Sequence, residues 1–513
     1  MKGERVGGLQ SAGFPVRWHW GRPMSKDENN EEEDWSKFAS AGYESAYDPW
    51  ADLVPQEESE EFLDDDIDFE DFSSIRPPPA EEGLDYLVKM GTCNHCMARL
   101  SGKSFNWESA EEVGISIRIS CEERGVMKDD DIEYCPYCED LFVDLDILVE
   151  VMKNELDGVE FKKMQLGAHF AKDHVAKEDD LRTRHGATGS QALKAAFNDA
   201  LGFKFSKEMG EIELVKDQPE VMVLIDTLTF DVTADLRSLY LYGRYRKLER
   251  GIPQTRWPCR VCKGRDGGCE TCNETGLQYP TSVQDQIGEP LRAAFQAKNT
   301  AFHGMGREDI DVRCLGRGRP FVIEMKSPIR RYADLSELTE LVNATSAGRL
   351  EISELRASRR SEVARIKGTA AEKSYTIRFK YGPEQHCPPV KIDGEEESQS
   401  EDVAEVVQEN PPEWTAEQVT ELCMSLEGVT LAQQTPQRVA HRRADKVRER
   451  QVVSISDIVV EGDEVEMTVR CESGTYVKEL VHSDEGRTVP SVAEKLGLVC
   501  EVTWLDVNDV HAD

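Results

Sequence analysis

The sequence predicts an α+β fold, and three observations support this prediction. Apolar residues recur at helical spacing in some segments, such as residues 140–156, whereas residues 464–470 alternate polar and apolar side chains as a half-buried strand does. The chain has 513 residues, of which 39% are hydrophobic, so a packed core is feasible over about two to four domains. An acidic segment near the N-terminus lies apart from these patterned regions.

Residues 1–82 are expected to be a disordered acidic tail. Residues 27–71 contain 19 acidic residues and one basic residue, a composition that buries too little apolar surface to fold. The whole chain has a net charge of −37, which is unusual for a protein that binds a polyanion. An acidic surface suits a high-salt cytoplasm, where salt screens charges over short distances, so we expect a salt-adapted archaeal protein. The alternative is a protein whose partners are cationic.

The sequence predicts neither secretion nor a membrane span. No stretch approaches the roughly 18 apolar residues that a membrane-spanning helix needs. The N-terminus lacks the basic-then-apolar pattern of a secretory signal. We therefore expect a cytoplasmic protein.

The cysteines indicate metal binding. Eight of the 14 cysteines fall in four Cys-x-x-Cys pairs, a spacing that lets two thiolates bind one ion, and two such pairs complete a tetrahedral zinc site. A site closed by four thiolates would be structural, and the alternative is a set of buried or free thiols. The first expected set comprises Cys93, Cys96, Cys135 and Cys138, and the second comprises Cys259, Cys262, Cys269 and Cys272.

Residues 85–250 are expected to form a zinc-bearing α/β domain. Helical spacing is found at residues 140–156 and 191–201, and residues 221–232 are rich in strand-forming side chains. The segment 237–263 is both basic and aromatic, with Tyr240, Tyr242, Tyr245 and Trp257 among its cations. It is either a surface that stacks bases and binds phosphates or a stiff strand between domains.

A Cys-rich connector at residues 251–281 is expected to lead into a second domain at residues 282–513. Amphipathic helices are predicted at 282–302 and around 335–342, and a polar acidic insertion at about 383–412. Residues 356–367 form either a phosphate contact or an ordinary exposed helix. Residues 438–450 carry six Arg or Lys against two acidic residues, an excess that favours phosphate binding.

The stretch from 303 to 324 is the strongest candidate for chemistry. Gly304 and Gly306 suit a tight turn, and residues 321–323 are expected to form a short buried strand. Between them, Asp309 is near Arg307 and Arg313 in sequence, and cations keep a neighbouring carboxylate ionised. An ionised carboxylate in a pocket can act as a nucleophile or a base.

This stretch resembles the Gly-Arg-x-Asp catalytic motif of pseudouridine synthases. The string GREDIDVRCLGRGRPFVIE looks like the THUMP-containing branch shared by archaea and eukaryotes, which acts on uridines 54 and 55 of tRNA. The strings TPQRVAHRRAD, GTYVK and VHSDEGRTVPS match further motifs of that family, except that Ser483 stands where glycine is expected. The resemblance covers about residues 85–510.

The resemblance implies a pseudouridine-synthase domain with a mixed, mostly antiparallel sheet, preceded by a THUMP-type RNA-binding domain. The implied partner is tRNA, a monomer is expected, and the family's reaction needs no cofactor. Asp309 would be the catalytic residue, with Asp311 as its rival, and the sequence leaves open whether it acts covalently or as a base. The implied substrate-binding residues are Tyr375 and Tyr476 at the target nucleotide, Arg307, which would fill or brace the space left by the extruded base, and Lys478. Either Lys478 or Arg313 would keep Asp309 charged.

The sequence is less consistent with two other functions. A zinc-containing tRNA-binding protein without activity would be expected to lack the Asp-Tyr-Lys set, which is present. A THUMP-bearing RNA methyltransferase would need a glycine-rich cofactor loop after a strand, and the sequence contains none.

Overall fold

The computed structural model describes residues 81–512, except residues 104, 130, 186–190, 266, 383–412 and 441–442. The predicted acidic insertion and nearly all of the predicted acidic tail therefore lie outside the described residues. None of the described helices is long and apolar enough to span a membrane.

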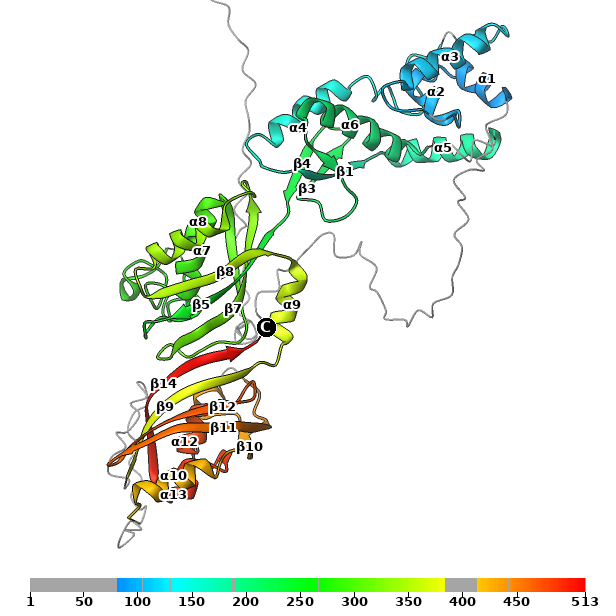
Figure 1. Ribbon diagram of the computed structural model, residues 1–513. Coiled ribbons are helices and arrows are strands. Elements are labelled where there is room, and N and C mark those ends of the chain that lie inside the picture. The colour runs from blue at the N-terminus through cyan, green and yellow to red at the C-terminus, as the bar shows by residue number, and fades with distance from the viewer. Residues whose placement is uncertain are drawn as a thin grey trace, which may run out of the picture.

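The described chain begins with helices and continues mainly as strands (Figure 1). The helices are α1 (Glu81–Lys89), α2 (Asn94–Leu100), α3 (Ala110–Glu122), α4 (Leu145–Glu155), α5 (Lys172–His185), α6 (Leu193–Met209), η4 (Glu270–Cys272), α7 (Val283–Ala294), α8 (Leu335–Thr345), α9 (Arg360–Gly368), α10 (Ala416–Met424), α11 (Gln437–Ala440), α12 (Val477–His482) and α13 (Val492–Leu496). The strands are β1 (Lys163–His169), β2 (Glu213–Leu214), β3 (Val221–Asp226), β4 (Val232–Leu236), β5 (Leu239–Lys247), β6 (Ala297–Gly304), β7 (Arg313–Pro328), β8 (Leu350–Ser358), β9 (Glu372–Gly382), β10 (Thr430–Gln434), β11 (Val447–Glu461), β12 (Glu464–Cys471), β13 (Thr488–Val489) and β14 (Val499–His511).

A small sheet with the order β2-β1-β3-β4 organises the N-terminal part. Strand β1 runs parallel to β2 and β3, and β4 pairs with β3 in the antiparallel direction. Alternate residues of β3 are buried, because successive side chains of a strand point to opposite faces and one face packs against the core. Phe197 and Phe205 of α6 pack into the same core, and each fully buried side chain of this size contributes about 1.5–3 kcal/mol.

A second sheet of ten strands forms the C-terminal part, with the order β13-β10-β11-β12-β9-β14-β7-β5-β8 and with β6 paired to β7. Strands β7 and β14 are parallel, whereas every other pair is antiparallel. The prediction of a mixed, mostly antiparallel sheet is confirmed. Helices α7 and α8 lie over β5, β7 and β8, and α10, α12 and α13 lie beside β9–β12 (Figure 1).

Two predicted helices have different limits in the structure. Residues 140–144 are not helical, because Asp140 adopts a φ of 63° and α4 begins only at Leu145. The helix predicted at 282–302 ends at Ala294: Gln296 has a φ of 47°, and from Ala297 the chain pairs with β7 as strand β6. The predicted strands at residues 321–323 and 464–470 are confirmed as parts of β7 and β12.

The alternative of an exposed base-stacking surface at residues 237–263 is wrong for two of its four aromatic residues. Strand β5 lies inside the large sheet between β7 and β8, so Tyr242 and Tyr245 are buried. Arg244 is also buried and donates hydrogen bonds to the carbonyl oxygens of Val510 and Ala512. The aromatic residues of β5 therefore contribute to the core, although the strand falls within the range expected for the N-terminal domain.

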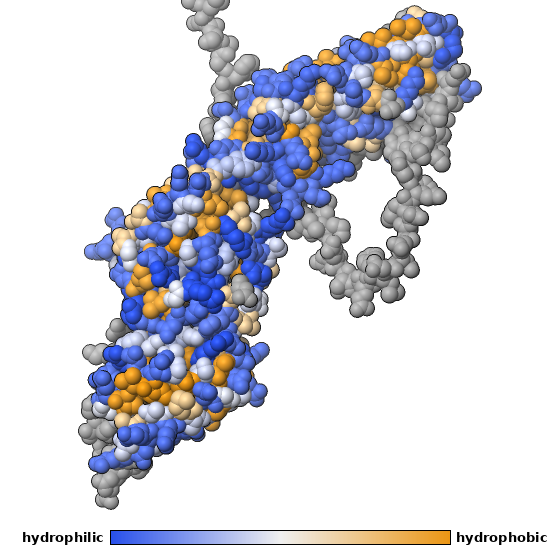
Figure 2. Space-filling view, viewed as in Figure 1, coloured by the Kyte–Doolittle hydropathy of each residue, from blue (hydrophilic) through white to orange (hydrophobic). Residues whose placement is uncertain are grey.

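The face drawn in Figure 2 is largely hydrophilic, and its hydrophobic residues gather in small separate patches. This distribution agrees with a chain in which 31% of residues are charged. Single exposed apolar residues such as Val143 and Leu228 are common on protein surfaces and need no partner.

Candidate functional site

Asp309 lies on the loop between β6 and β7, and its side chain is 32% exposed. The glycines before it are needed for close backbone packing. A Cβ on Gly304 would approach Nε2 of Gln254 to 2.9 Å, and Gly306 adopts a φ of 73°. The tight turn predicted from the sequence is therefore present, and it begins the loop that carries Asp309 between β6 and β7.

Two cations reach the Asp309 carboxylate. Nη1 of Arg438 lies 2.9 Å from Oδ2 of Asp309, whereas Nζ of Lys478 lies 3.7 Å from the same oxygen. Lys478 instead makes its shorter contact, 2.8 Å, to Oδ2 of Asp311. The predicted contact between Lys478 and Asp309 is thus longer than the contact between Arg438 and Asp309. The sequence motifs did not identify Arg438 as the nearer cation.

Arg313 does not contribute to this site. Its guanidinium pairs with Asp506 at 2.5 Å, because β7 lies next to β14 and Arg313 is opposite Asp506 in their register. The expectation that Arg313 keeps Asp309 charged is therefore wrong.

Arg438 is oriented by a buried carboxylate. Its Nε donates to Oε1 of Glu479 at 2.6 Å, and the Glu479 side chain is 1% exposed. One guanidinium therefore bridges a buried anion and the half-buried Asp309, a geometry that suits arginine's fixed fork of donors. In the sequence, Arg438 stands out only as part of the TPQRV string and of the basic residues 438–450, for which phosphate binding is predicted.

Asp311 differs from Asp309 in its surroundings. Its side chain is 60% exposed, compared with 32% for Asp309. Burial acts to raise the pKa of Asp311, but the hydrogen bond and the charge of Lys478, together with a backbone hydrogen bond and the charge of Lys247, lower it overall. Asp311 is therefore a paired rim residue, which favours Asp309 as the reacting group.

Tyr375 and Tyr476 come from β9 and from the N-cap position of α12. Burial raises the pKa of Tyr375, and the charge of Asp309 adds a smaller effect in the same direction. The hydroxyl of Tyr476 is buried and has no hydrogen-bond partner among the described residues, and such unsatisfied groups in native proteins often meet a ligand. Gln433 fixes the Tyr476 backbone through hydrogen bonds of 2.9 and 3.0 Å.

A buried network supports the loop from beneath. Glu308 accepts hydrogen bonds from the Tyr245 hydroxyl at 2.8 and 2.9 Å and pairs with Nε of Arg319 at 2.8 Å. Lys247 is fully buried, and its Nζ donates to the carbonyl oxygens of Ile252, Asp309 and Ile310 at 2.9–3.1 Å. These contacts could not be predicted from local sequence, because Tyr245 is 63 residues from Glu308 and Lys247 is 62 residues from Asp309.

Arg307 is exposed, and its guanidinium lies over the ring of Trp257, 5.9 Å from the centroid. This contact orients the side chain beside Asp309 without an ion pair to a described carboxylate. Arg307 can therefore reach a bound ligand without breaking a strong contact.

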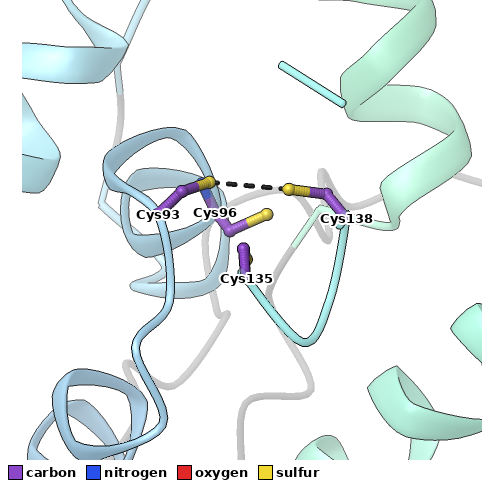
Figure 3. A group of neighbouring side chains, drawn as sticks. All are labelled: Cys93, Cys96, Cys135 and Cys138. Atoms are coloured by element: carbon purple, nitrogen blue, oxygen red, sulfur yellow. Dashed lines mark hydrogen bonds between the residues drawn. The ribbon is translucent and has the colours of Figure 1, made fainter. Parts of the chain in front are cut away.

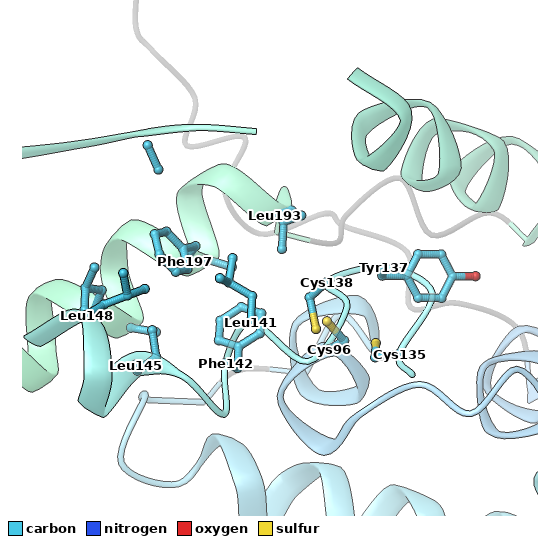
Figure 4. Close-up of a cluster of buried hydrophobic side chains, with 14 of the residues drawn as sticks. Cys96, Cys135, Tyr137, Cys138, Leu141, Phe142, Leu145, Leu148, Leu193 and Phe197 are labelled. Carbon is cyan, nitrogen blue, oxygen red and sulfur yellow. The ribbon is translucent and has the colours of Figure 1, made fainter. Parts of the chain in front are cut away.

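Each predicted cysteine set is brought together by the fold. In the first set, Cys93 at the N-cap of α2 and Cys96 within α2 face Cys135 and Cys138 of a turn (Figure 3). The four Sγ atoms lie within 4.8 Å of one another, with 3.6 Å between those of Cys93 and Cys138. Figure 4 shows Cys96, Cys135 and Cys138 beside the core cluster that includes Phe142, so an ion here would join α2 to that core.

The second set meets the same criterion, because its Sγ atoms also lie within 4.8 Å of one another. The backbone N–H groups of Cys269 and Gly276 donate to Sγ of Cys272 at 3.1 and 3.2 Å, and these donors lower its pKa to about 6. Thiolates in all-sulfur groups of this size fit structural zinc, which leaves no open position for catalysis.

Comparison with known proteins identifies similar sequences over most of the chain. The family model described as Pus10, C-terminal, matches residues 240–411 and 383–511, and the archaeal Pus10 THUMP domain matches residues 148–226. A protein of Methanothrix thermoacetophila is 38% identical over 71% of this chain and 74% of its own length. Proteins of Halorubrum lacusprofundi and Methanocaldococcus jannaschii are each 34% identical, over 82% and 80% of this chain and over 93% and 83% of their own lengths. All three carry the name tRNA pseudouridine synthase Pus10.

Proposed function

Because the chain belongs to the Pus10 family of tRNA pseudouridine synthases, we propose that it isomerises uridine 54, uridine 55 or both in the T-arm of tRNA, with Asp309 as the catalytic residue. One observation carries the choice of residue. The Asp309 carboxylate is half-buried and pairs with Arg438 at 2.9 Å, whereas Asp311 is mainly exposed.

The target uridine is stacked within the folded tRNA, so it must first be extruded. The domain that contains the THUMP match and the basic residues 438–450 would hold the arm through its phosphates. Arg307 would occupy the space left by the base. We expect the enzyme to act as a cytoplasmic monomer without a small-molecule cofactor.

The reaction is an isomerisation, so atoms are neither gained nor lost. The bond from C1′ to N1 of uracil breaks, the base turns, and a bond from C1′ to C5 forms. The C5 proton leaves and N1 gains a proton. Asp309 acts on the ribose or the base while the first bond breaks, and Arg438 with Lys478 positions its carboxylate.

The two phenols have separate roles in this proposal. The unpartnered hydroxyl of Tyr476 can hydrogen-bond to the extruded uracil, and the neutral ring of Tyr375 can lie against it. Both rings would exclude water from the site, which strengthens the electrostatic contacts to the reacting groups.

The test uses a tRNA transcript and purified enzyme, without a methyl donor. Carbodiimide-reactive uridines are mapped by primer extension, on transcripts in which uridine 54 or uridine 55 is replaced by cytidine. We expect Asp309→Asn to bind tRNA but form no pseudouridine, and Asp311→Asn to retain activity. The opposite pattern would transfer the catalytic role to Asp311, and an inactive wild type would refute the proposed function.

A further inference from the structure

The second cysteine set closes a small exposed module, here called the Cys knuckle, at residues 258–277. Its two ends are joined by a bridge between Pro258 and Leu277 and by a hydrogen bond of 2.8 Å from the Cys259 amide to the Gly276 carbonyl. A further bond of 2.9 Å runs from the Gln278 amide to the Trp257 carbonyl. The module is therefore a closed loop with a fixed base.

The base of the Cys knuckle is fastened to the catalytic loop. The Gly251 amide donates to the Ile310 carbonyl at 2.8 Å, and the Gln254 side chain donates to the Gly306 carbonyl at 2.9 Å. Trp257, the residue just before the knuckle, lies under Arg307. The knuckle therefore projects from the rim of the site that holds Asp309.

The first half of the knuckle carries free cations. Arg260 and Lys263 are exposed and make no ion pair with a described residue, and Val261 between them is 67% exposed. Neighbouring arginines are neutralised: Arg250 pairs with Asp506, and Arg256 pairs with carboxylates of α7. In a chain with a net charge of −37, unpaired cations beside the site are available for a polyanion.

The second half of the knuckle is acidic. Glu270 and Glu274 are both exposed and lie on the η4 side of the module. A polyanion would be repelled by this half and attracted by the other, so the knuckle can admit RNA in one orientation.

We propose that the tip of the Cys knuckle, Arg260 to Lys263, is a tRNA contact that holds the backbone beside the extruded uridine. Arg260 and Lys263 bind phosphates, and Val261 packs against a ribose or a base. Such contacts position the substrate without reading its sequence. This inference rests on the proposed function, because it requires tRNA at Asp309.

The test compares two double variants of the full-length protein with wild type. Arg260→Gln/Lys263→Gln removes the two cations, and Glu270→Gln/Glu274→Gln removes two anions from the same module. Binding of a tRNA transcript is measured by fluorescence anisotropy across a salt series. Zinc content and the single-turnover rate at saturating tRNA are measured on the same preparations.

We expect the first variant to bind about tenfold more weakly at low salt, and the slope of log Kd against log salt to fall by about two, one unit for each lost phosphate contact. Its zinc content and its saturated rate should match wild type. The second variant should bind as tightly as wild type or more tightly. The charge-conserving variant Arg260→Lys/Lys263→Arg should recover the wild-type slope, which excludes misfolding of the knuckle as the cause.

An unchanged Kd and salt slope in Arg260→Gln/Lys263→Gln would overturn the inference, and so would failure of the charge-conserving variant to recover the slope. Neither result would affect the proposed function while wild type still modifies the transcript. A wild type that neither binds nor modifies tRNA would refute the proposed function instead.

Discussion

Replacing Glu308 by glutamine should destabilise the large-sheet part of the protein strongly, although the substitution is nearly isosteric. The Glu308 side chain is 0% exposed and that of Arg319 is 1% exposed, and their closest atoms lie 2.8 Å apart. Glutamine can still accept the hydrogen bond from the Tyr245 hydroxyl. It cannot neutralise Arg319, whose Nη1 donates a hydrogen bond of 2.8 Å to the uncharged Met305 carbonyl.

The size of the effect follows from the burial of both charges. Breaking a buried ion pair from one side leaves an uncompensated charge and costs about 3–5 kcal/mol. For a folding unit of 150–250 residues, each kcal/mol lowers Tm by about 2–4 °C, so Glu308→Gln should lower Tm by about 6–20 °C. Removing both charges in Glu308→Gln/Arg319→Met leaves no buried ion, so the double variant should be more stable than Glu308→Gln.

The assay is thermal unfolding followed by circular dichroism, with guanidinium titration as a second measure of stability. Each variant is also tested for pseudouridine formation well below its Tm. Glu308→Gln should reduce the single-turnover rate, because Glu308 fixes the loop one residue before Asp309. The reasoning would be refuted if Glu308→Gln lowered the free energy of unfolding by less than about 1 kcal/mol. It would also be refuted if the loss in Glu308→Gln/Arg319→Met equalled the sum of the losses in the two single variants.

Arg438→Ala should lower the single-turnover rate about 100-fold while tRNA affinity changes less than tenfold, because mispositioning of a reacting group has a cost of about that size. Arg438→Lys should retain more activity than Arg438→Ala. Equal losses in rate and affinity would contradict a positioning role for Arg438. Burial lowers the pKa of Lys373 from 10.5 to about 8, so the unfolded chain binds more protons between these values. Stability measured by guanidinium titration should therefore rise by about 3 kcal/mol from pH 8 to pH 10.5, and this rise should be absent in Lys373→Met. Purified protein should contain about two zinc ions per chain by mass spectrometry, and Cys96→Ser or Cys272→Ser should each lower the content to about one; an unchanged content would exclude zinc from that cysteine set.

Local patterns were sufficient where a residue's environment depends on its near neighbours in sequence. The alternation at residues 464–470 predicted β12, because a strand with buried alternate residues needs that pattern. The Cys-x-x-Cys spacing predicted both cysteine sets, since two ligands of each pair are already close. The Gly304 and Gly306 turn followed in the same way, from the backbone freedom of glycine.

Burial of the basic and aromatic segment could not be predicted from its composition. Tyr242, Arg244 and Tyr245 look like an RNA-binding surface in sequence, but Tyr242 and Tyr245 pack into two buried hydrophobic clusters. The cost of burying Arg244 is offset by carbonyls of the distant C-terminal strand, which no local pattern reveals.

By itself, the sequence indicated the family and the α+β fold class, it grouped the eight cysteines that the fold brings together, and it singled out Asp309 as the proposed catalytic residue. Only the tertiary structure decided which cation meets that aspartate: Arg438 rather than Arg313, with Lys478 shared with Asp311. The physical reason is that charge pairing depends on distances of a few ångström between groups more than 100 residues apart. Those distances are set by strand register and helix placement, and composition does not encode them locally.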